Sequence, residues 1–233
     1  MPHETLAHEY VTMEQASVPH IICFGDSLTA GYQSPTMACP QLLETPYGRF
    51  LQDRLGAGAR VAVSGLCGET TGDMVIRFRR DVAPHRPAWV VILGGTNDLG
   101  WNVAPSEIMA NLVQLYDQAR DRGIQPVAVT VPSIRAGGGP EEAVHGTTDS
   151  GLLGEERRWL AGHIDRRRIL NRLIMGYCAE QGMACVDLFT DTVEPDTGQL
   201  AARYSNDGLH LTTEGYERLA ALLYQQVFAA ACR

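Results

Sequence analysis

Four short segments, met in order along the chain, contain the residue types that acyl transfer requires. The first offers a hydroxyl nucleophile, the second and third offer donors for a developing oxyanion, and the fourth offers a carboxylate with an imidazole. The segments are Gly25-Asp26-Ser27-Leu28, Leu66-Cys67-Gly68-Glu69-Thr70, Gly95-Thr96-Asn97-Asp98 and Asp207-Gly208-Leu209-His210. Together they predict a nucleophilic serine with its own base.

Ser27 is the predicted nucleophile, and His210 is the predicted base. A serine hydroxyl is nearly unreactive without a base within hydrogen-bond reach, so the first segment means little without the fourth. Asp207 stands three positions before His210, with Gly208 between them. The carboxylate can therefore hold one ring nitrogen and stabilise the imidazolium while the other nitrogen faces Ser27.

The oxyanion donors are predicted to be the backbone N–H of Ser27, the backbone N–H of Gly68 and the side-chain amide of Asn97. Gly68 suits a close backbone approach because it has no side chain. An alternative stays open, since both Gly68 and Asn97 are also common turn residues. Asp26 and Asp98, next to these groups, are interpreted as carboxylates that orient loops.

The elements that position these segments alternate along the chain. Continuous apolar runs, typical of strands buried on both faces, occupy 20–24, 60–64, 88–93, 125–131 and 183–188. Helical spacing lies between them, at 47–55, 71–81, 106–122, 155–181 and 212–231. This alternation predicts an α/β fold with a parallel sheet. Ser27, Gly68 and Asn97 each follow a predicted strand, so they should share the sheet edge where parallel folds bind ligands.

The length of 233 residues fits one domain, expected over 20–233 after an N-terminal extension at 1–19. Residues 134–156, which include three consecutive glycines, predict a flexible loop that is either a substrate flap or an inert insertion. The first 19 residues lack the features of a secretory signal, which predicts a cytoplasmic location.

The composition excludes several classes of binding partner and of chemistry. The formal net charge of −8 argues against nucleic acid, and the apolar runs are too short for stable membrane insertion. The chain has no lysine, which excludes Schiff-base chemistry. Its cysteines lack paired spacing, so buried free thiols are expected, with no metal and no cofactor. Two arginine clusters, at 77–80 and 166–168, are interpreted as solvated helix faces.

The four segments resemble blocks I, II, III and V of the GDSL/SGNH hydrolase family, and the resemblance covers about residue 20 to the end of the chain. It implies a flavodoxin-like three-layer α/β/α sandwich with a five-stranded parallel sheet, the SGNH hydrolase fold. It also implies metal-free hydrolysis of esters and thioesters, with Ser27, Asp207 and His210 as the triad and with Gly68 and Asn97 completing the oxyanion hole.

Block II departs from the family pattern, because Ser64 stands where asparagine is usual. Gly65 is therefore a rival for the oxyanion role. The segment Gly68-Glu69-Thr70 is the better match to the family's Gly-Asp-Thr, so we favour Gly68.

The predicted function is a carboxylic ester hydrolase that forms an acyl-Ser27 intermediate on small or short-chain esters, acetyl esters included. Leu28, Tyr32, Trp101 and Ile134 are predicted pocket walls for this small-molecule substrate. Two alternatives remain: a lysophospholipase or thioesterase for longer acyl chains, and a non-catalytic ligand-binding module on the same fold. The sequence does not predict the oligomeric state.

Overall fold

A computed structural model describes residues 18–37, 39–136 and 154–231. Its main sheet has five parallel strands in the order β4-β1-β5-β6-β7, which confirms the predicted fold class. The strands are β1 (His20–Gly25), β4 (Arg60–Gly65), β5 (Trp89–Leu93), β6 (Gln125–Val129) and β7 (Ala184–Val186).

The strand order reverses beside β1. From β1 the chain passes to β4 on one side, and then crosses to β5, β6 and β7 on the other side. A crevice forms at such a reversal, outside the carboxyl ends of the two strands that flank it. The segments after β1 and β5 therefore meet at the natural ligand site of the fold.

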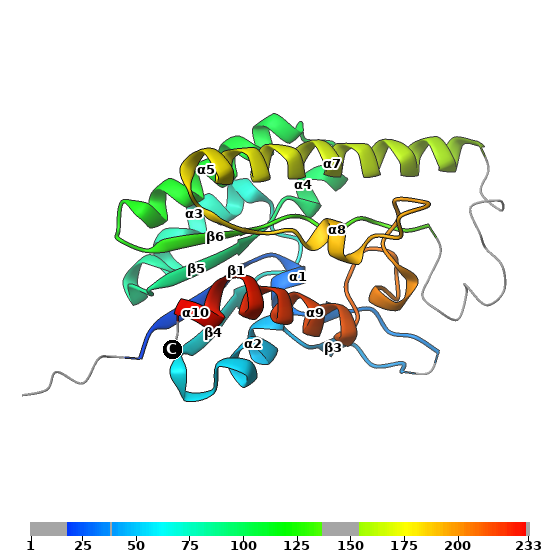
Figure 1. Ribbon diagram of the computed structural model, residues 1–233. Helices are drawn as coiled ribbons and strands as arrows, with labels where there is room; N and C mark the ends of the chain where they lie inside the picture. Colours follow the sequence, from blue (N-terminus) through cyan, green and yellow to red (C-terminus); the bar gives the residue numbers. More distant parts are fainter. Residues whose placement is uncertain (1–17, 38, 137–153, 232–233) are drawn as a thin grey trace, which may run out of the picture.

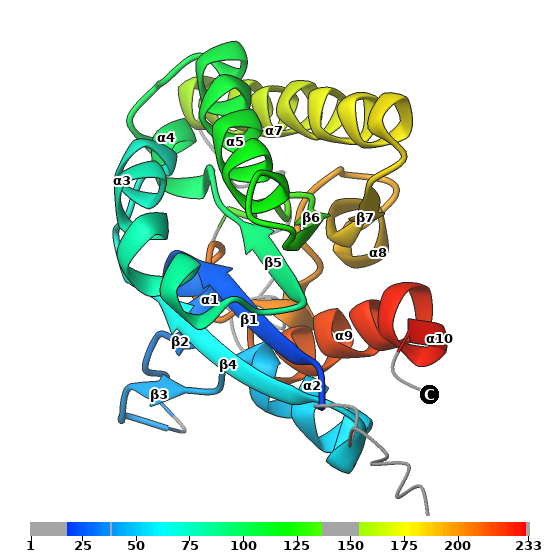
Figure 2. The ribbon, with the colours of Figure 1, turned by 90° about the vertical axis from the view of Figure 1, so that its left-hand side faces the viewer.

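Helices cover both faces of the sheet (Figures 1 and 2). The helices α3, α5 and α7 pack on one face, and α2 and α9 pack together on the other, giving three layers. Their bounds are α2 (Tyr47–Leu55), α3 (Thr71–Asp81), α5 (Pro105–Arg120), α7 (Gly154–Gln181) and α9 (Thr213–Leu223). After α9 the chain continues through a π-helical turn (Tyr224–Phe228) into α10 (Ala229–Ala231).

Capping residues explain the sharp helix starts. The Thr70 hydroxyl accepts the N–H of Asp73, whose carboxylate accepts the N–H of Thr70, a complete capping box before α3. Thr212 caps α9 by accepting the N–H of Gly215. The bounds of α2 and α3 agree with the predicted ranges, although α2 begins after Pro46 without a side-chain cap.

The edge strands correct one expectation. Burial on both faces holds for most of β1, β5 and β6, but β4 is partly exposed along its length and Val63 is 40 % exposed. β7, at the opposite edge, is also only partly buried. An edge strand has a neighbour on one side only, so fewer helices cover it.

Several short elements were not predicted. Two of them begin directly at the motifs after β1 and β5, and a third follows β7. They are α1 (Ser27–Ala30), α4 (Thr96–Gly100) and α8 (Leu188–Thr192), together with a small hairpin of β2 (Tyr32–Gln33) and β3 (Leu43–Glu44).

The predicted loop at 134–156 lies mostly outside the described residues, which omit 137–153. Its described ends are built into the fold: Ile134 packs with Leu160, Ile164 and Phe189, and residues 154–156 form the first turn of α7. At the described C-terminal end, residues 154–156 are therefore helical where a loop was predicted. Of the predicted N-terminal extension, only residues 18 and 19 are described.

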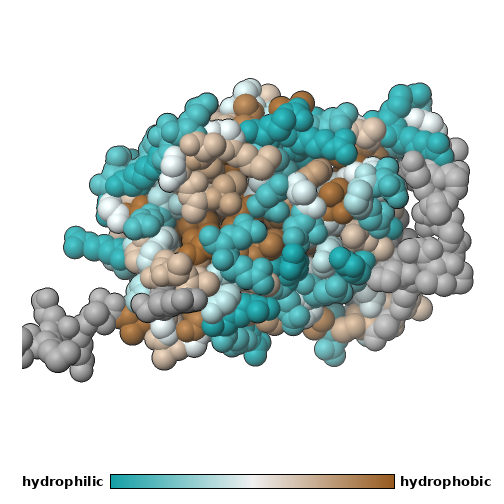
Figure 3. Space-filling model, viewed as in Figure 1, coloured by the Kyte–Doolittle hydropathy of each residue, from teal (hydrophilic) through white to brown (hydrophobic). Residues whose placement is uncertain are grey.

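On the face seen in Figure 3, hydrophilic residues cover most of the area, with smaller hydrophobic areas between them. Among the described helices, none combines the length and the apolar character that a membrane crossing needs.

Candidate active site

Ser27 is the first residue of α1, directly after β1. Asp26 caps this helix, because its Oδ1 accepts the N–H of Leu28 at 2.9 Å. Two glycines let α1 sit close to the sheet: a Cβ at Gly25 would lie 2.4 Å from Oγ1 of Thr29, and one at Gly65 would lie 2.2 Å from the nitrogen of Ala30. Gly65, the rival for the oxyanion role, is thus explained by packing against the helix that carries Ser27.

His210 links Ser27 to Asp207. Its Nε2 lies 3.1 Å from the Oγ of Ser27, and its Nδ1 lies 2.7 Å from Oδ2 of Asp207. The carboxylate accepts a hydrogen bond from Nδ1–H, which leaves Nε2 unprotonated. Nε2 can therefore accept a hydrogen bond from the hydroxyl of Ser27. The structure therefore brings the three predicted residues together in the predicted order, although they are far apart in the sequence.

Five hydrogen bonds hold the Asp207 carboxylate, one of them a longer bond from the Ser205 hydroxyl to Oδ1 at 3.4 Å. Oδ1 accepts the N–H groups of Leu209 at 2.8 Å and His210 at 2.7 Å, and Oδ2 accepts the Ser34 hydroxyl as well as the His210 ring. Burial opposes ionisation, but the hydrogen bonds from His210, Ser34 and the two backbone N–H groups outweigh it and lower the pKa of Asp207 below its ordinary value. Asp207 is an anion at neutral pH.

Two further side chains support this array without having been predicted to do so. Ser34 follows β2 and reaches Asp207 across 173 positions of sequence, so no local pattern announces it. The Tyr32 ring lies with its centroid 4.5 Å from that of the His210 ring. Tyr32, predicted as a pocket wall, therefore packs against the imidazole.

Gly68 occupies a turn at the end of the segment after β4. The N–H of Glu69 donates to the carbonyl of Leu66 at 3.4 Å, and Gly68 has a φ of +80°, the left-handed conformation that favours glycine. A Cβ at Gly68 would meet nothing within 4 Å. The backbone conformation therefore gives a reason for glycine at this position, and the space beside it stays open for the close approach of a ligand that the sequence predicts.

Asn97 ties this turn to the neighbouring segment. It is the second residue of α4, and its side-chain amide donates to the carbonyl oxygen of Glu69 at 2.8 Å. An amide carries two N–H groups, so one bond leaves the second for a ligand. The Ser27 N–H lies in the first turn of α1, where backbone N–H groups have no intrahelical acceptor.

Asp98 and Asp26 orient backbone segments, as predicted. Asp98 accepts the N–H of Thr71 at 3.0 Å and its hydroxyl at 2.6 Å. Asp26 is fully buried, and its Oδ2 has no partner among the described protein groups. Burial raises the pKa of Asp26 to about 7, and the charges of Asp98 and Glu69 add to the rise. The hydrogen bond from the N–H of Leu28 and the charge of His210 oppose it.

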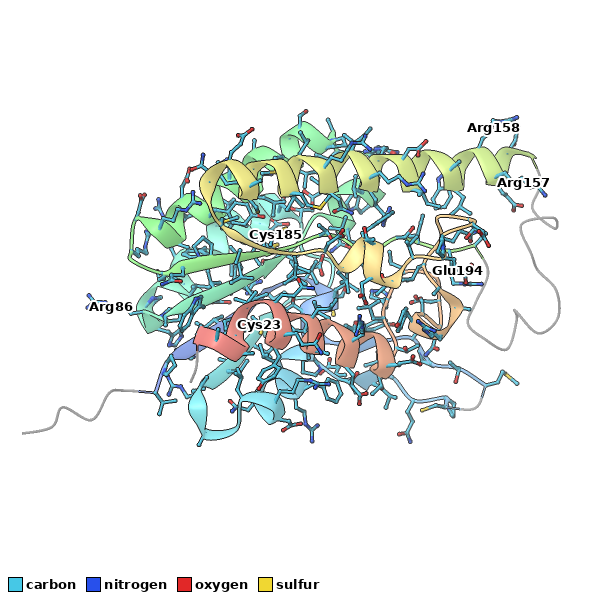
Figure 4. The ribbon with its side chains drawn as sticks, viewed as in Figure 1. Cys23, Arg86, Arg157, Arg158, Cys185 and Glu194 are labelled. Carbon is cyan, nitrogen blue, oxygen red and sulfur yellow. The ribbon has the colours of Figure 1, made fainter. Side chains whose placement is uncertain are left out.

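The cysteines match the expectation only in part. Cys23 and Cys178 are buried and free, whereas Cys67 is exposed; Cys23 lies on β1 and Cys185 on β7 (Figure 4). Partial burial and the charges of Glu44 and Asp26 raise the pKa of Cys67, which disfavours the nucleophilic thiolate. Within the described ranges, no group of three or more His, Cys, Asp or Glu residues is placed to hold a metal ion.

A cleft of about 450 Å³ opens beside Asn97 and Asp207. Trp101, which is 78 % exposed, and Ile134 line it as predicted. Leu28 does not line it: the side chain faces inward from α1 and is fully buried, so that prediction was wrong. The other lining residues are Thr96, Gly100, Arg135, Trp159, His163, Arg167, Gly208 and Leu209.

Two arginines correct the interpretation of the basic clusters as solvated faces. Arg77 and Arg167 are only 6 % and 2 % exposed. Arg77 faces the sheet and pairs with Glu69, while Arg167 faces the cleft. Their neighbours Arg80 and Arg168 are exposed, as expected.

The three-layer α/β/α sandwich and the histidine-bound serine at the carboxyl edge of its sheet define a serine hydrolase. Residues 23–218 match the model of the GDSL-like lipase/acylhydrolase family, and the chain belongs to that family. It is therefore an enzyme of the serine esterase and acylhydrolase class.

Relatives and solved structures agree with this assignment. The uncharacterized lipoprotein YqeF of Bacillus subtilis is 23% identical over 89% of this chain and 87% of its own length. An arylesterase of Vibrio mimicus is 30% identical over 48% of this chain and 54% of its own length. The crystal structure of Est24, a carbohydrate acetylesterase from Sinorhizobium meliloti, superposes with a TM-score of 0.67 at 23% identity and covers 91% of this chain and 99% of that one.

Proposed function

We propose that this protein hydrolyses carboxylic esters through an acyl intermediate on Ser27. The observation that carries the proposal is the unbroken hydrogen-bonded series from the Ser27 hydroxyl through His210 to Asp207. A nucleophile, a base and a group that orients the base are the parts that activate a serine.

In the first half of the reaction, the Ser27 oxygen attacks the ester carbonyl while Nε2 of His210 takes the hydroxyl proton. Asp207 holds Nδ1 and stabilises the imidazolium that forms. The imidazolium then returns the proton to the departing alcohol, which leaves an acyl ester on Ser27.

In the second half, a water molecule attacks the acyl carbonyl and His210 acts as its base. Both tetrahedral intermediates carry a negative oxygen that needs donors held in advance. We assign this role to the N–H groups of Ser27 and Gly68 and to the Asn97 amide. The bond from Asn97 to the carbonyl of Glu69, next to Gly68, supports the assignment because it fixes the amide against the turn.

The substrates are proposed to be esters with small or short acyl chains, including acetyl esters. A cleft of about 450 Å³ with Trp101 and Ile134 in its walls supports this size. The names of the arylesterase and the carbohydrate acetylesterase noted above are consistent with it.

The test is hydrolysis of a p-nitrophenyl ester series, from acetate to long acyl chains, by the wild type and by Ser27→Ala in parallel. The proposal predicts Ser27-dependent turnover that is fastest for the short chains. A maximum at long chains would favour the lysophospholipase or thioesterase alternative. No Ser27-dependent turnover of any ester would favour the binding module.

Two expectations from the sequence stay predictions. A single hydrolase domain over 20–233 predicts one cooperative unfolding transition in calorimetry. A cytoplasmic location predicts that the protein is recovered in the cytosolic fraction of its own cells.

A further inference from the structure

Arg167 is a buried cation that pairs with no acidic side chain in the part of the chain that the structure describes. The residue is 2 % exposed, and its Nε and Nη1 atoms have no hydrogen-bond partner among the groups that the structure describes. Burial and the like charge of Arg166 lower its pKa to about 10, so it remains a cation at neutral pH. A buried charge that lacks a counter-charge is costly, and none of residues 18–37, 39–136 and 154–231 supplies one.

Arg167 belongs to a row on one face of α7 that ends in the cleft. Trp159, His163 and Arg167 follow one another at intervals of four residues, and all three line the cleft. The first turns of α7 extend past the ends of the strands, as the labels of Arg157 and Arg158 show (Figures 1 and 4). The cleft thus runs between the candidate catalytic groups and this face of α7.

The surroundings of Arg167 fit a flat organic group with one negative charge. The rings of Trp159 and His163 lie 4.2 Å apart between centroids, and Trp101 forms another aromatic wall. Burial and the charges of Arg167 and Arg166 lower the pKa of His163, so the imidazole is neutral at neutral pH. Arg135, the other arginine in the cleft wall, pairs with Glu194 at 3.5 Å. Arg167 is therefore the one guanidinium of the described cleft lining without a counter-charge, and a single positive charge matches a carboxylate better than a phosphate dianion.

We propose that Arg167 binds a carboxylate of the substrate, so that the preferred substrates are esters of small molecules that carry a free acid group. The inference rests on the ester hydrolysis proposed above and adds the substrate class. The carboxylate fills the fork of the guanidinium at the α7 end of the cleft while the ester lies at Ser27. The aromatic side chains pack against the part of the substrate between these two groups.

The test uses two pairs of esters that differ in charge. In the first pair the acid group is on the acyl side: 4-nitrophenyl hydrogen adipate against methyl 4-nitrophenyl adipate. In the second pair it is on the alcohol side: 4-acetoxybenzoate against its methyl ester. The quantity compared is the ratio of kcat/KM within a pair, wild type against variant, which cancels the intrinsic reactivity of each ester.

In Arg167→Met, we expect kcat/KM for the acid-bearing ester of one pair to fall at least about tenfold, because a charge-assisted bidentate contact is lost. Its neutral partner should change less than twofold. Arg167→Lys should recover part of the loss, and the pair that responds tells which side of the ester faces α7. The matched control is Arg172→Met, which removes the same charge from an exposed position of α7 and should change neither pair.

Equal losses for charged and neutral esters in Arg167→Met would overturn the inference, because they would indicate a structural role. Unchanged ratios in both pairs would also overturn it. A second readout does not depend on turnover: adipate or benzoate should raise the melting temperature of Ser27→Ala and should not raise that of Ser27→Ala/Arg167→Met. Failure of the ester series with this anion effect intact would count against the proposed function and leave the carboxylate site standing.

Discussion

Arg77 and Arg167 are both buried, and they differ in what surrounds them. Arg77 makes two bonds to the Glu69 carboxylate and also bonds to Asp81, to the hydroxyl of Ser64 at 2.6 Å and to the carbonyl of Gly25 at 3.0 Å. Arg167 faces the cleft with Nε and Nη1 unpartnered among the described groups. Arg77 therefore stabilises the fold, whereas Arg167 has free donors for a ligand.

The same contrast divides the candidate site into two ends. At the catalytic end, Asp207 accepts five hydrogen bonds and Asn97 is fixed to the turn at Glu69. At the α7 end, a buried cation lies beside aromatic rings and an imidazole. Catalytic groups must be held in position by the protein before the substrate binds, whereas a recognition group can keep its hydrogen-bonding atoms free for the substrate.

Replacing Asp207 by asparagine should have the largest effect on activity. The amide can no longer hold His210 in the tautomer that accepts the Ser27 proton, so kcat should fall on the order of 10⁴-fold. The measurement is p-nitrophenyl acetate turnover, with circular dichroism as the control for folding. A loss of less than tenfold would show that the carboxylate does not set the tautomer.

Breaking the partnered arginine should have the largest effect on stability. Glu69→Gln leaves Arg77 buried without its bidentate anion, which should cost about 3 kcal/mol, or roughly 6–12 °C in melting temperature. Arg167→Met removes a cation that has no such partner, so it should leave the melting temperature unchanged or raise it. Similar losses in the two variants, measured by thermal unfolding, would remove the distinction between the two arginines.

Asn97→Ala tests the fixed donor at the catalytic end. Loss of one oxyanion donor should lower kcat by about 10²-fold and change KM little, because the donor acts on the transition state. Steady-state kinetics on p-nitrophenyl acetate gives both constants. A rise in KM at constant kcat would place Asn97 in ground-state binding instead.

Asp26→Asn should have the smallest effect, seen in the pH dependence of stability. The folded-state pKa of Asp26 is raised to about 7, above an unfolded value near 4, so the folded protein loses stability as pH rises from about 4 to 7. Asparagine keeps the acceptor for the N–H of Leu28 and cannot ionise. Its melting temperature relative to the wild type should therefore be higher at pH 8 than at pH 5, and an equal difference at both would refute the raised pKa.

The sequence predicts the long elements well because their signals are local. Apolar runs mark all five strands, and α2 and α3 begin and end at the predicted residues. Short elements such as α1 and α4 span only four and five residues, too few for a periodic pattern. Leu28 was misplaced for this reason, because its inward direction depends on a helix that the sequence does not announce.

The burial of the two arginines was not predicted, because the clusters were interpreted from their charge alone and not from the helix face on which each arginine lies. Arg77 stands three residues after the buried Met74 on α3, and Arg167 stands midway between the buried Ile164 and Leu170 on α7. Each is therefore on the apolar face of its helix, a signal that was present in the sequence. Whether such an arginine pairs with a carboxylate depends on segments far away in the sequence, and only the folded structure shows which of them lie beside it.

The most direct test of the central claim is the reaction of the wild type and His210→Ala with a fluorophosphonate, read by intact mass and peptide mapping. An activated serine predicts one adduct in the wild type, located on Ser27, and none in His210→Ala within the same time. An unmodified wild type, or equal labelling of both proteins, would contradict a Ser27 nucleophile activated by His210.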